Sequence, residues 1–358
     1  MPSPHSLSSS YADARSSFLA TARSVGASID SFAHPSRGLH DEELAIDVAR
    51  LGPDDASDVV VVVSGTHGVE GYCGSAVQTR WLDELSTQRP HDVAVVMVHA
   101  LNPFGFSWVK RSNEDNVDLN RNFIDWSAPL PENPGYDAIA ELLVPAAWDG
   151  AERERADGLL FEWYASVAPE DAQQIVSGGQ FRHVDGVFYG GTEPAWSHRW
   201  LRAWSTEHLA AARRVAIIDI HTGLGPWGHG ELISASAPGS AEYDRATQWW
   251  DEVTSMGDDS VSAVITGDWL QAAPSWAPDA EVTPIAIEYG TVDTISVLQA
   301  LRADAWLHVH GDAASTPWAD EVRAQVRAAF ADDDPAWFDA VWTRACQVIE
   351  QTFVALSD

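Results

Sequence analysis

Five consecutive valines, Val59–Val63, constrain the fold of this 358-residue chain more than any other stretch. Their β-branched side chains favour extended backbone, and so short an apolar run is typical of a strand buried on both faces. The run stops at Ser64-Gly65, and an apolar helical pattern begins beyond Gly74. A second apolar strand is predicted at Val93–His99. The order strand, helix, strand predicts a parallel pair of strands joined by a right-handed crossover.

The remaining periodicity predicts one α/β domain over residues 1–358, built as a three-layer α/β/α sandwich. Its central sheet is expected to be mixed, mainly parallel and about eight strands wide. Residues Glu43–Leu51 are predicted to form a strand at the sheet edge. The helical pattern of residues 137–212 indicates a helical insertion at about 127–213. Further strands are predicted at Val215–His221, Glu231–Ser234, Val261–Ile265 and Pro284–Glu288, and terminal helices at 10–25 and from Pro335 onward.

Composition narrows the partners that the protein can have. The net charge of −32 argues against nucleic acid and anionic membrane, because such a field repels phosphate. Two cysteines, Cys73 and Cys346, are too few for a disulfide framework or a cysteine-based zinc site. The first residues lack the basic and apolar regions of a signal peptide, and no apolar run is long enough to span a membrane. We therefore expect a cytoplasmic protein that acts on a small molecule or short peptide; the sequence leaves oligomerisation open.

His67 and Glu70 follow the valine strand in a loop punctuated by glycines. In open α/β sheets, ligands bind at the carboxyl ends of the strands, which is where this loop is predicted to lie. A histidine and a carboxylate three residues apart can meet on one small centre, and both are good zinc ligands. The alternative is that His-x-x-Glu occurs here by chance, as it often does in surface ion pairs.

The setting of His67 recurs twice later in the chain. His221 ends an apolar strand and precedes Thr-Gly, and Glu288 ends the apolar run Ile-Ala-Ile. A single histidine at a strand end is more often structural, but the repetition favours a shared centre. An acidic residue at the end of a buried strand is costly unless it has a partner or a task. Two histidines, one carboxylate and a water form the open site of a catalytic zinc, and a second carboxylate can accept a proton from that water.

These residues resemble the zinc carboxypeptidase superfamily, which includes carboxypeptidase A-like and aspartoacylase/succinylglutamate desuccinylase enzymes. The resemblance runs from about residue 58 to 290, and the motifs follow the family's order along the chain. The wording Ser-Gly-Thr-His-Gly-Val-Glu-Gly is further similar to a bacterial branch known mainly as an uncharacterised domain. The matching pieces are His67-x-x-Glu70, Arg111, Asp118-Leu-Asn120-Arg121-Asn, Asp219-Ile-His221 and Glu288.

The resemblance implies a role for each matching residue. His67, Glu70 and His221 would hold one Zn²⁺ per chain, with Asp118 steadying His67. Glu288 would be the general base and then the acid. The resemblance further implies that Arg111 stabilises the oxyanion and that Asn120 and Arg121 grip a substrate carboxylate.

Two assignments have no motif behind them. The peptidases of this superfamily use a mobile tyrosine, for which Tyr189 and Tyr289 are the candidates in substrate binding. Asp219, just before His221, is expected either to support that ligand or to bond the backbone.

The sequence thus predicts a zinc-dependent hydrolase that cleaves an amide bond of a small carboxylate-bearing substrate. Both a metallocarboxypeptidase-like peptidase and an N-acyl-amino-acid amidohydrolase, a deacylase, fit the motifs. An ester or lactone hydrolase on the same centre would have the same sequence features. An inactive zinc-binding module is the remaining alternative, although the presence of all three ligands and of Glu288 argues against it. The long insertion favours small substrates over polypeptides.

Overall fold

The computed structural model describes residues 6–257 and 260–357. One eight-stranded sheet runs through the molecule in the order β1-β2-β4-β3-β5-β8-β6-β7. The four central strands, β4, β3, β5 and β8, are parallel, whereas β2 and β6 pair antiparallel with their inner neighbours. The strands are β1 (Ser28–Arg37), β2 (Glu43–Leu51), β3 (Asp58–Ser64), β4 (Val93–His99), β5 (Arg214–Trp227), β6 (Gly230–Ser234), β7 (Val253–Ser255) and β8 (Glu281–Gly290).

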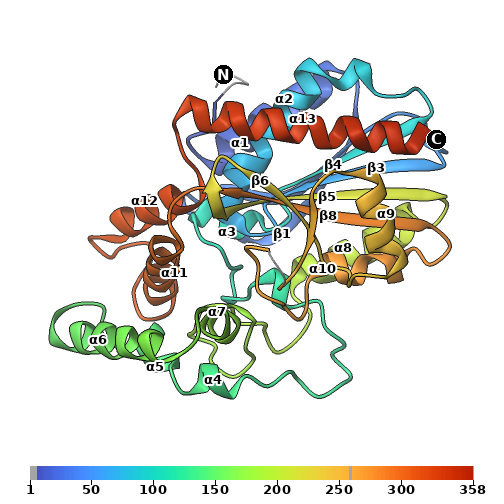
Figure 1. Cartoon of the computed structure of the whole chain (residues 1–358). Coiled ribbons are helices and arrows are strands. Elements are labelled where there is room, and N and C mark those ends of the chain that lie inside the picture. Colours follow the sequence, from blue (N-terminus) through green and yellow to red (C-terminus); the bar gives the residue numbers. More distant parts are fainter. Residues whose placement is uncertain (1–5, 258–259, 358) are drawn as a thin grey trace.

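Helices cover both faces of the sheet, which makes three layers (Figure 1). Alternate valines of β3 explain why: Val60 and Val62 belong to the apolar cluster under one layer, while Val59, Val61 and Val63 belong to the cluster under the other. A strand buried on both faces needs apolar side chains at every position. One layer consists of α1 (Tyr11–Ser24), α2 (Gly71–Glu84), α9 (Ala241–Trp249) and α13 (Pro335–Ser357); the other consists of α8 (Trp196–His208), α10 (Trp269–Ala272) and η4 (Ala273–Trp276).

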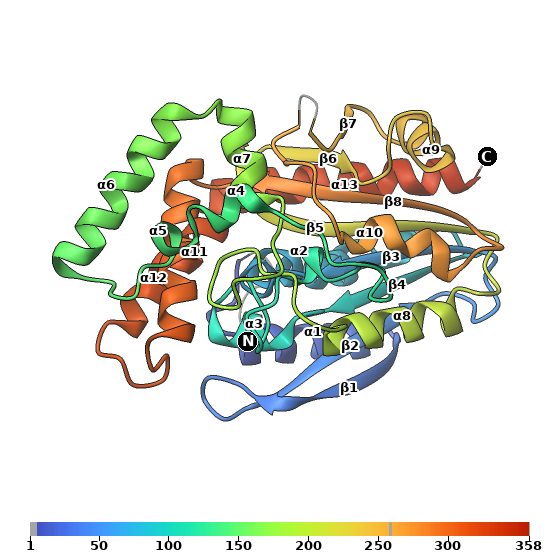
Figure 2. The same ribbon diagram turned by 90° about the horizontal axis from the view of Figure 1, so that it is seen from below.

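The remaining helices gather beyond the carboxyl ends of the parallel strands (Figure 2). They pack around a third apolar cluster, which includes Phe106, Leu301 and Phe330. The segment 127–213 contributes four of these helices before it enters the sheet layers with α8, and α6 stands out from the body (Figures 1 and 2). This group consists of α3 (Pro103–Trp108), α4 (Pro134–Asp137), α5 (Ala140–Leu143), α6 (Gly150–Ser166), α7 (Pro169–Ser177), α11 (Thr294–Val309) and α12 (Ala319–Phe330).

The mixed, mainly parallel sheet of the sequence analysis is confirmed, and so is the parallel crossover from β3 through α2 to β4. Two predicted strands need correction. Glu43–Leu51 is not at the edge, because β1 pairs with its outer side and leaves most of its own residues exposed or half-exposed. Val261–Ile265 forms no strand, and the edge strand β7 lies earlier, at Val253–Ser255. Within the described ranges, no helix is both long enough and apolar enough to cross a bilayer.

Candidate metal centre and substrate pocket

The turn after β3 carries His67 and Glu70, the latter in the 3-10 turn η1 (Gly68–Glu70). It lies against the loop after α3, where the amide of Gly68 donates to the carbonyl of Arg111 at 3.1 Å. A side chain at position 68 would not fit, since a Cβ atom there would lie 2.1 Å from the backbone of Gly105. Glycine therefore lets this turn approach the backbone of α3 closely, with His67 and Glu70 on either side of position 68.

The neighbouring parallel strands supply His221 and Glu288. His221 of β5 lies beside Glu288 of β8 in the strand register, and Ser64 at the end of β3 lies beside Ile220. Because these strands are parallel and aligned, their carboxyl ends reach the same edge of the sheet. The side chains of His67, His221 and Glu288 line one pocket at that edge.

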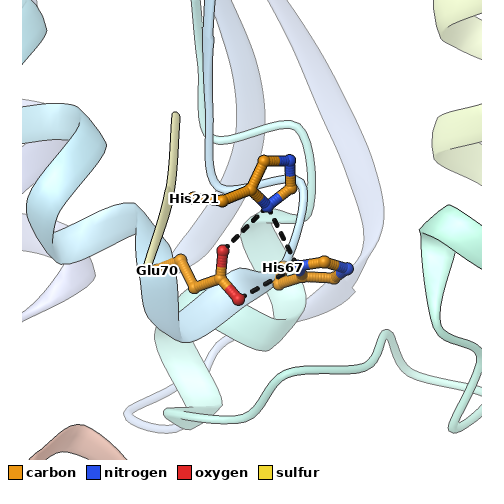
Figure 3. A group of neighbouring side chains, drawn as sticks. All are labelled: His67, Glu70 and His221. Carbon is orange, nitrogen blue, oxygen red and sulfur yellow. Dashed lines mark hydrogen bonds and ion pairs between the residues drawn. The ribbon is translucent and has the colours of Figure 1, made fainter. Parts of the chain in front are cut away.

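His67, Glu70 and His221 form a compact, buried cluster (Figure 3). Each offers one ligand atom, and these atoms lie within 4.8 Å of one another. The two carboxylate oxygens of Glu70 lie 2.9 Å from Nδ1 of His67 and 3.0 Å from Nδ1 of His221, and the two Nδ1 atoms are 3.2 Å apart. Two imidazole nitrogens and a carboxylate are the donor set of an open zinc site.

A second carboxylate fixes each imidazole from its far side. Nε2 of His221 lies 2.7 Å from Asp219, and Nε2 of His67 lies 3.1 Å from Asp118. Asp219 also accepts hydrogen bonds from the hydroxyl of Thr66 at 2.9 Å and from the indole of Trp269 at 2.6 Å. At His221 the Asp219 carboxylate holds the proton on Nε2, which leaves Nδ1 free to bind a metal ion. The structure thus places Asp219 against the ring of His221.

The charges in this cluster depend on one another. Burial alone would lower the pKa of His221, but the Asp219 and Glu70 carboxylates raise it well above its usual value. Burial would raise the pKa of Glu70, yet His67 and His221 hold it below the usual range. The pKa of Asp118 is likewise lowered despite its burial, because two arginines lie nearby. The cluster therefore keeps its carboxylates ionised, as metal ligands and their supports need to be.

Arg111 lies beside the cluster and is fixed at both ends of its guanidinium. Its Nε donates to Asp118 at 3.0 Å, and its Nη1 donates to Glu70 at 3.0 Å. Its Nη2 lies 2.9 Å from Nε2 of His67, and the ring of Phe188 lies 5.4 Å from its central carbon. This places a fixed positive charge in the pocket wall next to the ligands.

Glu288 lies in the same pocket, but its carboxyl differs from that of Glu70 in protonation. Burial is the main reason that its pKa rises to about 7, and the negative charge of Glu70 adds to the effect. One oxygen, Oε1, accepts a hydrogen bond from the amide of Leu224 at 2.9 Å. A carboxyl that titrates near neutral pH can both accept and donate a proton.

Arg121 and Asn120 also line the pocket, at the end of η3 (Leu119–Arg121). The Arg121 guanidinium donates through Nε to the carbonyl of Ser177 at 3.0 Å and through Nη1 to the carbonyl of Asn120 at 3.2 Å. Its Nη2 also donates to the Ser177 carbonyl, at the end of α7. The amide oxygen of Asn120 is buried without a hydrogen-bond partner among the described residues. Arg121 therefore joins the sheet edge to the helical insertion.

Neither candidate tyrosine lies in the pocket wall. Tyr289 follows Glu288 on β8 and so points to the opposite face of the sheet, where it is fully buried in the core. Tyr189 contributes its backbone carbonyl, which accepts from the amide of Asp118 at 2.8 Å, but its side chain does not line the pocket. The expectation that these two side chains bind substrate is therefore not supported by their positions. Tyr164 of α6 lines the pocket instead, and no motif in the sequence marks it.

The pocket has a volume of about 360 Å³, which is within the range of small-molecule sites. Sequence reasoning missed a second carboxyl in its wall, that of Asp268. This side chain is buried, caps α10 through a hydrogen bond to the amide of Leu270, and has a pKa raised to about 6 by burial. Asp268 stands in a short Gly-Asp-Trp loop without periodicity, so the sequence carries no signal for its position.

One family model, described as protein of unknown function (DUF2817), matches residues 7–344. A search of the curated proteins found no sequence that matches the chain.

Solved structures share the fold at low sequence identity. Bovine thrombin-activatable fibrinolysis inhibitor, in complex with tick carboxypeptidase inhibitor, aligns over 97% of this chain and 99% of its own, with 11% identity and a TM-score of 0.51. Carboxypeptidase A from Helicoverpa armigera aligns over 92% and 75%, with 14% identity and a TM-score of 0.48. An aspartoacylase family protein from Mesorhizobium loti aligns over 79% and 67%, with 14% identity and a TM-score of 0.41. The resemblance to zinc carboxypeptidases is thus confirmed for the fold, and the family of unknown function agrees with an uncharacterised branch.

Proposed function

This chain belongs to the family described as protein of unknown function (DUF2817), and from its site we propose that it is a zinc-dependent hydrolase of amide bonds. The proposed substrate is a small molecule with a free carboxylate, such as an N-acyl amino acid or a short peptide.

One observation carries this proposal: two imidazole nitrogens and a carboxylate converge within 4.8 Å, in a pocket that also holds Glu288. The donor set fits zinc, and the aspartate behind His221 favours the tautomer that leaves Nδ1 of this ring free. When bound there, zinc supplies the Lewis acidity that activates water and polarises a carbonyl group.

The residues around the cluster supply the proton transfers and the charge. In the proposed reaction, the oxygen of water bonds to the carbonyl carbon and the carbon–nitrogen bond breaks. Glu288 accepts a proton from the attacking water and passes it to the leaving nitrogen, so that the carboxylate is restored. Its pKa of about 7 suits both directions of transfer near neutral pH. Arg111, fixed by Asp118, offers positive charge to the carbonyl oxygen as negative charge develops on it.

We assign Arg121 to the substrate carboxylate. A guanidinium has five N–H groups, and the hydrogen bonds of Arg121 to the backbone of Asn120 and Ser177 use three of them. One N–H on each terminal nitrogen is left, and these two can bind a carboxylate from the pocket. Asn120, whose amide oxygen has no hydrogen-bond partner among the described residues, adjoins Arg121 in the chain and lines the same pocket.

The test is Glu288→Gln in zinc-loaded protein, assayed on N-acyl amino acids, dipeptides and the corresponding esters. We expect the variant to keep about one zinc per chain and to lose at least ~10²-fold in kcat, the usual contribution of a general base. Glu281→Gln is the matched control, because Glu281 lies exposed at the other end of β8. Near-normal turnover by Glu288→Gln would remove its role as base. Hydrolysis of esters alone by the wild type would replace the amidase proposal with an esterase.

A further inference from the structure

Beyond the cluster of His67, Glu70 and His221, two groups of apolar side chains line the pocket, and each is called a wall here. The first wall belongs to the cluster around α7, α11 and α12 and includes Val176, Leu301 and Phe330. The second wall belongs to the cluster under the other sheet layer and includes Ile233 and Ala286. These five residues are themselves buried in the protein, so they form a fixed apolar lining against which an apolar group of a ligand can pack.

Hydrogen bonds join the insertion to the segment 261–265, which contributes residues to the pocket lining. Gln173 of α7 donates to the carbonyl of Val261 at 2.7 Å. Gln174 donates to the carbonyl of Val264 at 2.7 Å and accepts from the amide of the same residue at 3.1 Å. The same segment supplies Ala263 and Ile265 to the pocket lining. The two segments that line this part of the pocket are therefore held together by side-chain hydrogen bonds.

The charged residues that line the pocket can bind one carboxylate of a substrate and would disfavour a second. Among the described lining residues, the arginines are Arg111 and Arg121, and lysine is absent. Arg111 is paired with Glu70 and Asp118 at 3.0 Å each, whereas Arg121 has the longer pair with Asp118 at 3.9 Å, so Arg121 is the arginine that the substrate can more readily engage. The carboxyl groups of Glu288 and Asp268 face the same space and would repel a further anion.

From these observations we infer that the substrate is an N-acyl amino acid whose acyl group is bulky and apolar, in contrast to acetyl or a dicarboxylic acyl group. This inference rests on the proposed function and names its substrate class. The amino acid carboxylate binds Arg121, the amide lies at the metal cluster, and the acyl chain lies between the two apolar walls.

A series of N-acyl alanines that differ only in acyl length tests the substrate class. Each methylene buried against an apolar wall is worth about four-fold in kcat/KM, from ~0.8 kcal/mol per group. We expect kcat/KM to rise by about that factor per carbon from acetyl to octanoyl, and N-succinyl alanine to be cleaved more slowly than N-butanoyl alanine. Fastest cleavage of the acetyl or succinyl compound would overturn the inference and leave the proposed amidase intact. If none of these amides is hydrolysed, the proposed function itself is overturned.

Ala263→Phe tests whether the enclosure holds the acyl chain. The added ring fills space in the pocket, so we expect the octanoyl-to-acetyl ratio of kcat/KM to fall at least ten-fold. The matched control is Val264→Phe, the next residue, whose side chain is 54% exposed; its ratio should equal that of the wild type. An unchanged ratio in Ala263→Phe overturns the assignment. Calorimetry of octanoate binding to zinc-loaded wild-type protein tests the same assignment without requiring a variant that folds. If octanoate does not bind at millimolar concentration, the assignment of the pocket to the acyl chain is also overturned.

Discussion

The strand-end cluster and the helical insertion build the same pocket by different means. In the cluster, each histidine ring nitrogen has a neighbour within 3.2 Å, and the side chains come from the ends of parallel strands. In the insertion, α6 stands away from the body and leaves Phe161 75% exposed. The insertion meets the site through a few apolar side chains, the carbonyl of Ser177 and the two glutamines of α7.

This difference suggests that the cluster provides the catalytic groups and that the insertion determines substrate preference. Positions that are held by several polar partners within a buried sheet edge keep their geometry, which catalysis requires. A helical segment packed at the rim can change in sequence without disturbing that geometry. Such a segment can therefore determine the shape of the pocket and which substrates fit it. We therefore expect substitutions in the cluster to abolish function and substitutions in the insertion to alter preference.

The largest effect is expected from His67→Ala. Without one of three ligands, the protein should lose stoichiometric zinc and with it at least ~10³-fold of its activity. Elemental analysis after gel filtration measures the metal directly. His208→Ala is the control, because His208 is exposed on α8 and bonds the carbonyl of Trp204. Full zinc retention in His67→Ala would contradict the assignment of the cluster as a metal site.

Next comes a pH effect on stability in chelator-treated, metal-free protein. The folded-state pKa of Glu288 is raised from 4.5 to about 7, so the folded protein holds a proton that the unfolded chain releases within this window. Stability from this group is present below pH 4.5 and is lost as the pH rises through 7. Relative to Glu288→Gln, the wild type should lose up to about 3 kcal/mol between pH 4.5 and 8.

Denaturant unfolding of both proteins across this pH range measures the difference. Glu281→Gln should follow the wild type, because Glu281 is exposed on the same strand. A constant difference between wild type and Glu288→Gln at all pH values would mean that this carboxyl titrates normally.

Arg121→Lys probes the junction between the two regions. Lysine keeps the positive charge but lacks the planar guanidinium. In Arg121, part of this group donates to the Ser177 carbonyl and the remaining N–H groups are available to the pocket. We expect a decrease of about 10- to 100-fold in kcat/KM for carboxylate substrates, from ~1.5–3 kcal/mol for a charged hydrogen bond. Substrates in which a carboxamide replaces the carboxylate should lose much less. Equal losses for both would mean that Arg121 acts on structure and not on the substrate carboxylate.

The smallest effect is expected when the insertion is unfastened by the double substitution Gln173→Ala and Gln174→Ala. Each lost hydrogen bond is worth ~0.5–1.5 kcal/mol, so KM should rise a few-fold to about ten-fold while zinc content stays constant. The cluster lies outside these contacts and should keep its metal affinity. Loss of zinc in this variant would show that the insertion also supports the metal site, so that the two regions do not act independently.

The sequence was most informative where one physical pattern decided the outcome. The valine run has no polar position, so it could only be a doubly buried strand, and the crossover after it followed. β1 was missed because its residues alternate weakly and include Pro35 and several polar side chains, so periodicity gave no signal. The segment 261–265 forms no strand because two of its carbonyls, at Val261 and Val264, accept hydrogen bonds from α7, and Ala263 and Ile265 line the pocket.

The sequence by itself indicated that His67, His221 and Glu288 lie near one edge of the sheet, because apolar runs stop at or just before them and parallel strands share one edge. The prediction that the strand ends at His221 was wrong, because β5 continues to Trp227. It did not decide which tyrosine reaches the pocket. Alternation along β8 turns Tyr289 into the core, while Tyr164 belongs to α6, which precedes β5 in the chain and is separated from it by α7 and α8. It also gave no sign that Arg121 would bond the insertion. Tertiary structure alone decided these points, because contacts between distant segments depend on how whole elements pack and leave no local periodicity.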